Sequence, residues 1–130
     1  MKNVIATEKA PAAIGPYSQA IRCGQWLFCS GQIGLDPATG EMVSGGVVAE
    51  ATRVLENLRG VLAEAGASLD DVVRTTIYLI DLAEFSRVNE VYAAFFHAPF
   101  PARATVGVAA LPRGARVEID AIAMVGTGGS

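Results

Sequence analysis

Apolar positions along the chain change their spacing several times, and each spacing predicts a different kind of element. Short apolar runs over residues 17–23 and 26–30, separated by a glycine-containing turn, are typical of two strands. A helix is predicted next, because apolar residues then recur at intervals of three and four positions until Gly66. These residues are Val47, Ala51, Val54, Leu55, Leu58 and Leu62.

The second half of the chain continues with strand, helix and two more strands. The run RTTIYLI, residues 74–80, is rich in β-branched residues and predicts a strand. Asp81 and Glu84 have the spacing of a capping box and predict the start of a second helix, which the prolines at 99 and 101 end. Its apolar face is expected to carry Phe85, Val88, Val91, Tyr92, Phe95 and Phe96.

Two final strands are predicted over residues 104–109 and 116–125, joined by the sequence LPRG. The order β-β-α-β-α-β-β predicts one α+β domain over residues 1–130. In this fold two helices pack on one face of a mostly antiparallel β-sheet. Residues 126–130, GTGGS, are expected to form a loose tail.

Composition adds an expectation about assembly. Hydrophobic residues make up 52% of only 130 residues, more apolar surface than one small core hides, which favours an oligomer. The formal charge of −3 and the lack of a basic block count against a nucleic-acid binder. Since the sequence has neither a signal-peptide core nor a membrane-length apolar run, we expect a cytoplasmic protein. With a single histidine and no ligand cluster of zinc-like spacing, we expect no metal.

Arg103 is the first candidate for chemistry, because a guanidinium that opens an apolar strand needs an anion or several acceptors. Side chains alternate along strands, so Arg103 shares a face with Thr105, and Glu118 lies opposite the apolar face of the last strand. If these two strands pair as a hairpin, Arg103 and Glu118 come together on the non-core face. Spacing alone favours a surface salt bridge over a pocket that binds a carboxylate and moves a proton.

Four further residues stand out, each with an ordinary structural explanation beside a functional one. Asn89 lies at the edge of the second helix's apolar face, where a hydrogen bond to neighbouring backbone is the simpler expectation. Tyr17 follows a Gly-Pro turn at a strand start, where tyrosine usually packs with a solvated hydroxyl. Ser30 and Gly31 end a strand, and glycine there lets a ligand or another backbone approach closely.

Three segments taken together resemble the Rid family, the reactive intermediate deaminases, and within it the RidA type. They are IGPYSQAI, SGQIGLDPATGEM and PARATVGVAALPRGARVEIDAIA, and the resemblance spans residues 5–124. It implies a chorismate-mutase-like fold and a homotrimer with a site in each cleft between subunits. It also implies hydrolysis of 2-imino and enamine acids, such as 2-iminobutanoate and 2-iminopropanoate, to 2-oxo acids and ammonia, without a cofactor.

The resemblance also assigns roles to residues of this chain. Arg103 would bind the substrate carboxylate, and Glu118 would orient the attacking water and carry a proton, with Tyr17 as the third catalytic residue. Thr105 stands where many RidA-type proteins have cysteine, which is harmless if that position contributes mainly backbone. The residues expected to bind substrate are Arg103, Ser30, Gly31, Asn89 and Thr105.

Two other functions remain open from the sequence. One is a non-catalytic trimer that binds small carboxylates or unfolded chains, which would need Arg103 for binding and show no turnover. The other is an endoribonuclease or translation inhibitor, against which the acidic net charge counts.

Overall fold

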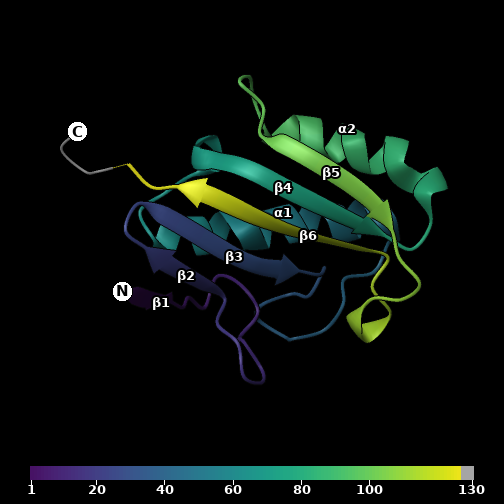
Figure 1. The fold of residues 1–130 in the computed structure, drawn as a ribbon. Coiled ribbons are helices and arrows are strands. Elements are labelled where there is room, and N and C mark those ends of the chain that lie inside the picture. The colour runs from purple at the N-terminus through teal and green to yellow at the C-terminus, as the bar shows by residue number, and fades with distance from the viewer. Residues whose placement is uncertain (127–130) are drawn as a thin grey trace.

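A computed structural model describes residues 1–126 as one sheet with two helices behind it (Figure 1). Residues 127–130 of the expected tail lie outside the described residues. The strands are β1 (Lys2–Ile5), β2 (Ala20–Cys23), β3 (Trp26–Gln32), β4 (Val72–Leu79), β5 (Ala102–Gly107) and β6 (Val117–Met124). The helices are α1 (Val47–Glu64) and α2 (Phe85–Phe95), and single 3₁₀ turns occur at Leu69–Asp71, Leu82–Glu84 and Pro112–Gly114.

The six strands lie in the order β1-β2-β3-β6-β4-β5. All neighbours are antiparallel except β4 and β5, which are parallel because α2 connects them as a crossover. The hairpin considered for the last two strands does not form, since β4 lies between β5 and β6. β1 was not predicted, because KNVI is short and mostly exposed.

The core lies between the two helices and one face of the sheet. All six residues predicted for the apolar face of the first helix are buried in α1, which confirms the spacing argument. From α2 and its end, Val88, Tyr92 and Phe96 are buried, and the other predicted residues pack partly buried against them. Within residues 1–126, neither helix combines the length and the apolar character needed to cross a membrane.

The opposite face of the sheet has no helix over it, and we call it the open face (Figure 1). It carries Trp26, Phe28, Val106 and Met124, each between 40% and 46% exposed. Large apolar side chains gathered on one face of a small protein mark an interaction surface.

Glu50 is the most deeply buried charged residue of α1, with 0% of its surface exposed. Its two carboxylate oxygens accept hydrogen bonds from Arg116, one from the backbone N–H at 2.8 Å and one from Nη1 at 2.7 Å. The pair fastens α1 to the residue that precedes β6. A buried carboxylate without its partner would be strongly destabilising, so this contact fixes where β6 begins.

We expect Glu50→Ala to lower the free energy of unfolding by about 1–3 kcal/mol, because it leaves the Arg116 backbone N–H without its acceptor while water reaches the half-exposed guanidinium. Glu56→Ala is the matched control on the same helix. It removes the partly exposed 3.4 Å pair with Arg53 and should cost less than about 1 kcal/mol. Urea unfolding at one fixed protein concentration measures both, and equal losses would contradict the structural role of Glu50.

Candidate functional site

Arg103 projects from β5 on the face of the sheet that the helices cover, at its outer edge. Its strand partner is Thr75, whose own partner on β6 is the buried Ala121. The guanidinium donates a 2.8 Å hydrogen bond from Nη1 to Asn89 Oδ1 on α2. Its central carbon lies 4.8 Å from the ring centre of Tyr92 and 5.2 Å from that of Phe85. We call these four residues, Arg103, Asn89, Tyr92 and Phe85, the arginine cluster.

The arginine cluster holds the cation with neutral partners. Cation–π contacts and one amide position the guanidinium without neutralising it. Among the described residues, no carboxylate lies within 4 Å of Arg103. A hollow of about 420 Å³ opens beside it, bordered also by Phe100 and Pro101. The arrangement therefore suits a small anion.

The aromatic support under Arg103 is itself fixed. The Tyr92 hydroxyl lies 2.7 Å from Thr75 Oγ1, and the Tyr92 ring stacks on Phe96 at 4.4 Å. The expectation that Asn89 would bond to neighbouring backbone is wrong, because its side-chain oxygen accepts from Arg103. Thr105 lies two residues along β5, on the same face as Arg103 and opposite the buried Ile77.

Glu118 lies on the open face, at the centre of the sheet. Its neighbour on β4 is Tyr78, and its neighbour on β3 is Gly31. A Cβ at residue 31 would overlap the Glu118 carboxylate, so glycine leaves room for this side chain. Burial raises the pKa of Glu118 above its ordinary value, and the charge of Asp120 raises it further. A carboxyl group whose pKa is raised in this way is a candidate to take up and release a proton.

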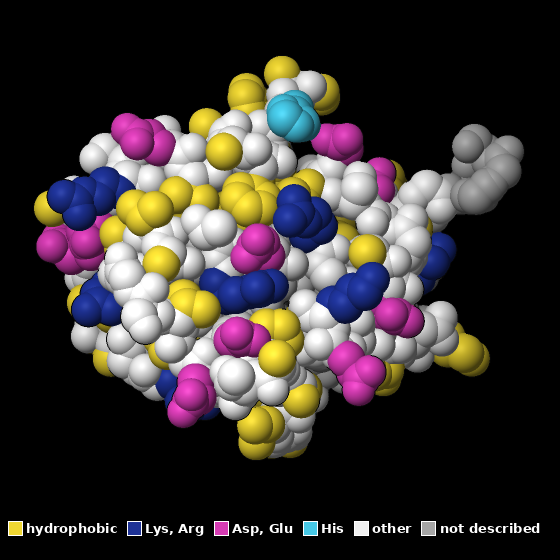
Figure 2. Space-filling view, turned by 180° about the vertical axis from the view of Figure 1, so that it is seen from behind, with side chains coloured by type: hydrophobic (Ala, Val, Ile, Leu, Met, Phe, Trp, Pro, Cys, Tyr) yellow, Lys and Arg dark blue, Asp and Glu magenta, His cyan; other side chains and the backbone are white. Residues whose placement is uncertain are grey.

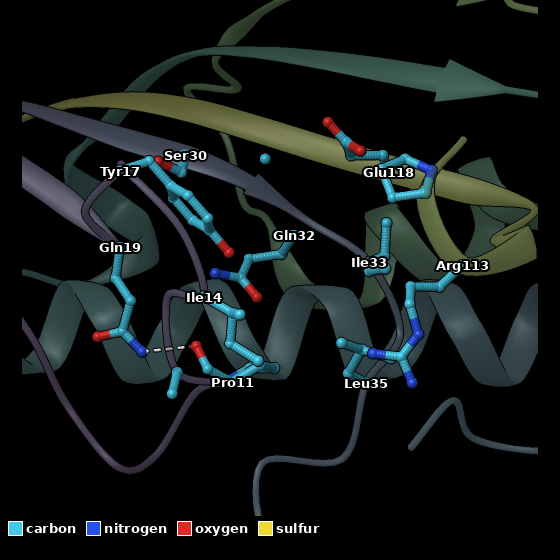
Figure 3. Close-up of a pocket in the computed structure, with 13 residues that line it drawn as sticks. Pro11, Ile14, Tyr17, Gln19, Ser30, Gln32, Ile33, Leu35, Arg113 and Glu118 are labelled. Carbon is cyan, nitrogen blue, oxygen red and sulfur yellow. Dashed lines mark hydrogen bonds between the residues drawn. The ribbon is translucent and has the colours of Figure 1, made fainter. Parts of the chain in front are cut away.

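A second hollow, of about 580 Å³, reaches from Glu118 toward Tyr17 and Arg113 (Figure 3). We call it the glutamate hollow. Ile14, Ile33 and Leu35 give it apolar walls, and the ring of Tyr17, which is 55% exposed, stands at its edge. Concave apolar walls with a few polar groups are typical of small-molecule sites.

Ser30 and Gln19 hold the loop that carries Tyr17. The Ser30 hydroxyl donates to the Ser18 carbonyl at 2.6 Å, and the Ser30 N–H donates to the Gln19 carbonyl at 3.0 Å. The buried Gln19 amide donates to the carbonyls of Ala10 and Pro11 at 3.2 and 2.8 Å, the second drawn in Figure 3. Sequence reasoning missed Gln19, because one amide beside a strand start is not a specific signal.

The predicted site residues therefore form two groups. Arg103, Asn89 and Thr105 lie together on the helix side at one edge, whereas Tyr17, Ser30, Gly31 and Glu118 border the glutamate hollow. The expectation that Arg103 and Glu118 lie close together on one face is wrong for a single chain. With β4 between their strands, Arg103 is in register with the core residue Thr75 and Glu118 with the open-face residue Tyr78.

Comparison with known proteins agrees with this architecture. Residues 7–125 match a family model described as Endoribonuclease L-PSP. A mouse (Mus musculus) protein named 2-iminobutanoate/2-iminopropanoate deaminase is 53% identical over 97% of this chain and 93% of its own length. A solved structure from Yersinia pestis, described as a protein of unknown function of the conserved Rid protein family, is 48% identical. It superposes with a TM-score of 0.94 over 96% of this chain and 100% of its own.

The chain belongs to the Rid family. Another solved structure, that of E. coli TdcF with bound serine, is 41% identical and has a TM-score of 0.92, covering 96% of this chain and 100% of its own. The two helices, the mixed six-stranded sheet and the order of elements are those of the Rid fold. The fold class expected from the sequence is confirmed.

Alanine substitutions at two glycines of this Rid chain distinguish an effect on the site from an effect on packing. We expect Gly31→Ala to displace the flexible Glu118 carboxylate and to change the free energy of unfolding by less than about 1 kcal/mol. Gly34→Ala should cost about 1–3 kcal/mol, because its Cβ would lie 2.9 Å from the backbone Cα of Glu50. Urea unfolding and a crystal structure of each variant check this. An unmoved Glu118 in Gly31→Ala would contradict the first expectation.

Proposed function

We propose that this Rid-family protein hydrolyses small 2-imino acids, such as 2-iminobutanoate and 2-iminopropanoate, to 2-oxo acids and ammonia. The observation that carries the proposal is the 53% identity, over nearly the whole of both chains, to a mouse protein named for that activity. The geometry agrees with it, since Arg103 is a positioned cation with no carboxylate partner in residues 1–126 and Glu118 is a partly buried carboxyl group.

We further propose that each complete site forms between two copies of the chain, in a homotrimer. One copy would supply the arginine cluster and the next would supply the glutamate hollow. Because the two groups lie on opposite faces, a head-to-tail ring of copies can join them, whereas one chain does not. The apolar side chains of the open face provide surface for this contact.

Arg103 would bind the substrate carboxylate. A guanidinium matches both oxygens of a carboxylate and so fixes the plane of the substrate and the position of its C2 atom. Asn89 engages one end of the guanidinium and leaves other N–H groups for the ligand. Thr105 would contribute backbone, since β5 is an edge strand with unpaired groups on its outer side.

Glu118 would accept a proton from water and return it to the leaving nitrogen. In the first step a water oxygen bonds to C2 of the protonated imine, one water proton passes to the Glu118 carboxylate, and the C=N electron pair moves onto nitrogen. Glu118 then returns that proton to the nitrogen, and the C–N bond breaks with its electrons leaving on ammonia. The remaining hydroxyl gives its proton to the released ammonia, which becomes ammonium, and the carbon is left with the 2-oxo group.

The polar groups around Tyr17 would complete the site. Its hydroxyl would help to hold the water, Gly31 would leave space beside Glu118, and Ser30 would act mainly by holding the Tyr17 loop. The bound serine in the TdcF structure is a related ligand, since an α-amino acid has a carboxylate beside a carbon that bears nitrogen. That relative supports a small α-nitrogen carboxylate as the ligand class here.

RNA cleavage is not part of this proposal, although the family model carries an endoribonuclease description. Phosphate-backbone binding depends on gathered lysine and arginine side chains. The chain has 10 of these against 13 acidic residues. On the face in Figure 2 the two signs are interspersed.

We expect wild-type protein to accelerate hydrolysis of 2-iminobutanoate generated in situ by an amino-acid oxidase. Arg103→Ala should lower kcat/KM by about 100-fold or more, because the carboxylate anchor is lost. Arg103→Lys should fall between the two, since a lysine keeps the charge and loses the fork. Arg87→Ala, an exposed arginine of α2, is the control and should keep wild-type activity.

Turnover by Arg103→Ala at the wild-type rate would overturn the role of Arg103. Suppose that wild-type protein does not accelerate hydrolysis but still binds 2-oxobutanoate, and that this binding needs Arg103. The protein would then be a carboxylate-binding protein and not an enzyme.

A further inference from the structure

We propose that Asp120, held by the hydroxyl of Tyr78, is a positioning residue that keeps the exchangeable proton of a carboxylate pair on Glu118. This inference rests on the proposed function, because it explains how Glu118 both accepts and returns a proton. Neither Asp120 nor Tyr78 was among the residues singled out from the sequence.

The pair is built by strand geometry. Glu118 and Asp120 are two positions apart on β6, so both side chains stand on the open face, with Cα atoms about 7 Å apart. Their partners on β4 are Tyr78 for Glu118 and Thr76 for Asp120. The Tyr78 hydroxyl does not bond to its direct partner but donates diagonally to Asp120 Oδ2 at 2.9 Å.

Cations lie elsewhere. Among the described residues, no lysine or arginine nitrogen lies within 4 Å of either carboxylate. Arg116, which directly precedes β6, has its guanidinium 2.7 Å from the Glu50 carboxylate. Arg113, across the glutamate hollow, donates to the Gly40 carbonyl at 3.2 Å.

The remaining neighbours of Glu118 bring no positive charge close to it. On the open face, β3 contributes Gly31 beside the carboxylate, and β5 contributes Ala104 and Val106. β4 adds Tyr78 and, farther along its length, Arg74, while Tyr17 borders the hollow. Two partly buried carboxyl groups are therefore left on one face of β6, two positions apart.

A like charge nearby disfavours ionisation of a carboxyl group, and a hydrogen bond donated to its oxygens favours it. The Tyr78 hydroxyl gives its hydrogen bond to Asp120 and not to Glu118. The same bond is the main reason why the pKa of Tyr78 is raised, so Tyr78 stays protonated and remains the donor. Within residues 1–126 no side chain donates such a bond to Glu118, and burial followed by the Asp120 charge raises the pKa of Glu118.

Where the surroundings of two carboxyl groups push their pKa values apart, they assign the acid and the base of a site. Here the raised pKa of Glu118 and the Tyr78 bond to its neighbour leave Glu118 as the proton carrier. In the proposed trimer the open face is covered, which lowers the dielectric around the pair and strengthens the effect.

The test uses Asp120→Asn, which keeps the shape and removes the charge. Glu118 must be ionised to accept a proton from water, so kcat/KM should fall as the pH drops through its pKa. Without the Asp120 charge that pKa is lower, and the acid limb of the profile should move down by about one pH unit. Tyr78→Phe should move the acid limb less in the same direction, because it removes the hydrogen bond that holds the Asp120 carboxylate in place. Glu64→Gln, an exposed carboxyl group on α1, is the control and should leave the limb unchanged.

A second readout does not depend on turnover. The ¹³C carboxyl signal of Glu118, assigned with Glu118→Gln, is titrated in wild type, in Asp120→Asn and in Tyr78→Phe. A lower midpoint in both variants, with the trimer retained on size exclusion, supports the inference even if the protein hydrolyses no imine. An unchanged Glu118 midpoint in Asp120→Asn would overturn it, whatever the activity.

Discussion

β6 pairs with β3 along one edge and with β4 along the other, and the positions of the functional residues follow from this double pairing. It sets Glu118 between Gly31 and Tyr78 on the open face. It also leaves β5 at the edge of the sheet, in parallel register with β4, where Arg103 faces α2. The buried contact of Glu50 with Arg116 fixes the start of β6 and draws the nearest guanidinium in sequence away from Glu118.

The charges of the arginine cluster and of the glutamate hollow are complementary. Arg103 is supported by an amide and two rings, so its charge stays available, whereas Glu118 has an anion beside it and, in the described part of the chain, no cation within 4 Å. A substrate that carries a carboxylate at one end and a protonated imine next to it matches this polarity. In our account the two charges act on one molecule only when copies of the chain assemble, so the same contact that covers the open face completes the site.

Much of this was available from the sequence, because it depends on local periodicity. The three- and four-residue spacing located α1 and its buried face, and alternation placed Arg103 and Thr105 on one side of a strand. Alternation does not say which strands pair, so the insertion of β4 between β5 and β6 was missed, and with it the separation of Arg103 from Glu118. Gln19 and the diagonal bond from Tyr78 to Asp120 depend on long-range register, which no local pattern records.

The central claim, that each site takes its arginine and its glutamate from different copies, is tested most directly with mixed trimers. Arg103→Ala and Glu118→Ala are each expected to be inactive alone, and the two are unfolded together, refolded in equal amounts and assayed for 2-iminobutanoate hydrolysis. If sites form between neighbouring copies, about a quarter of them combine an intact arginine cluster with an intact glutamate hollow, so about a quarter of wild-type activity should return. If the mixture, with trimers shown to have exchanged subunits, remains as inactive as its components, both residues act within one chain and the account is wrong.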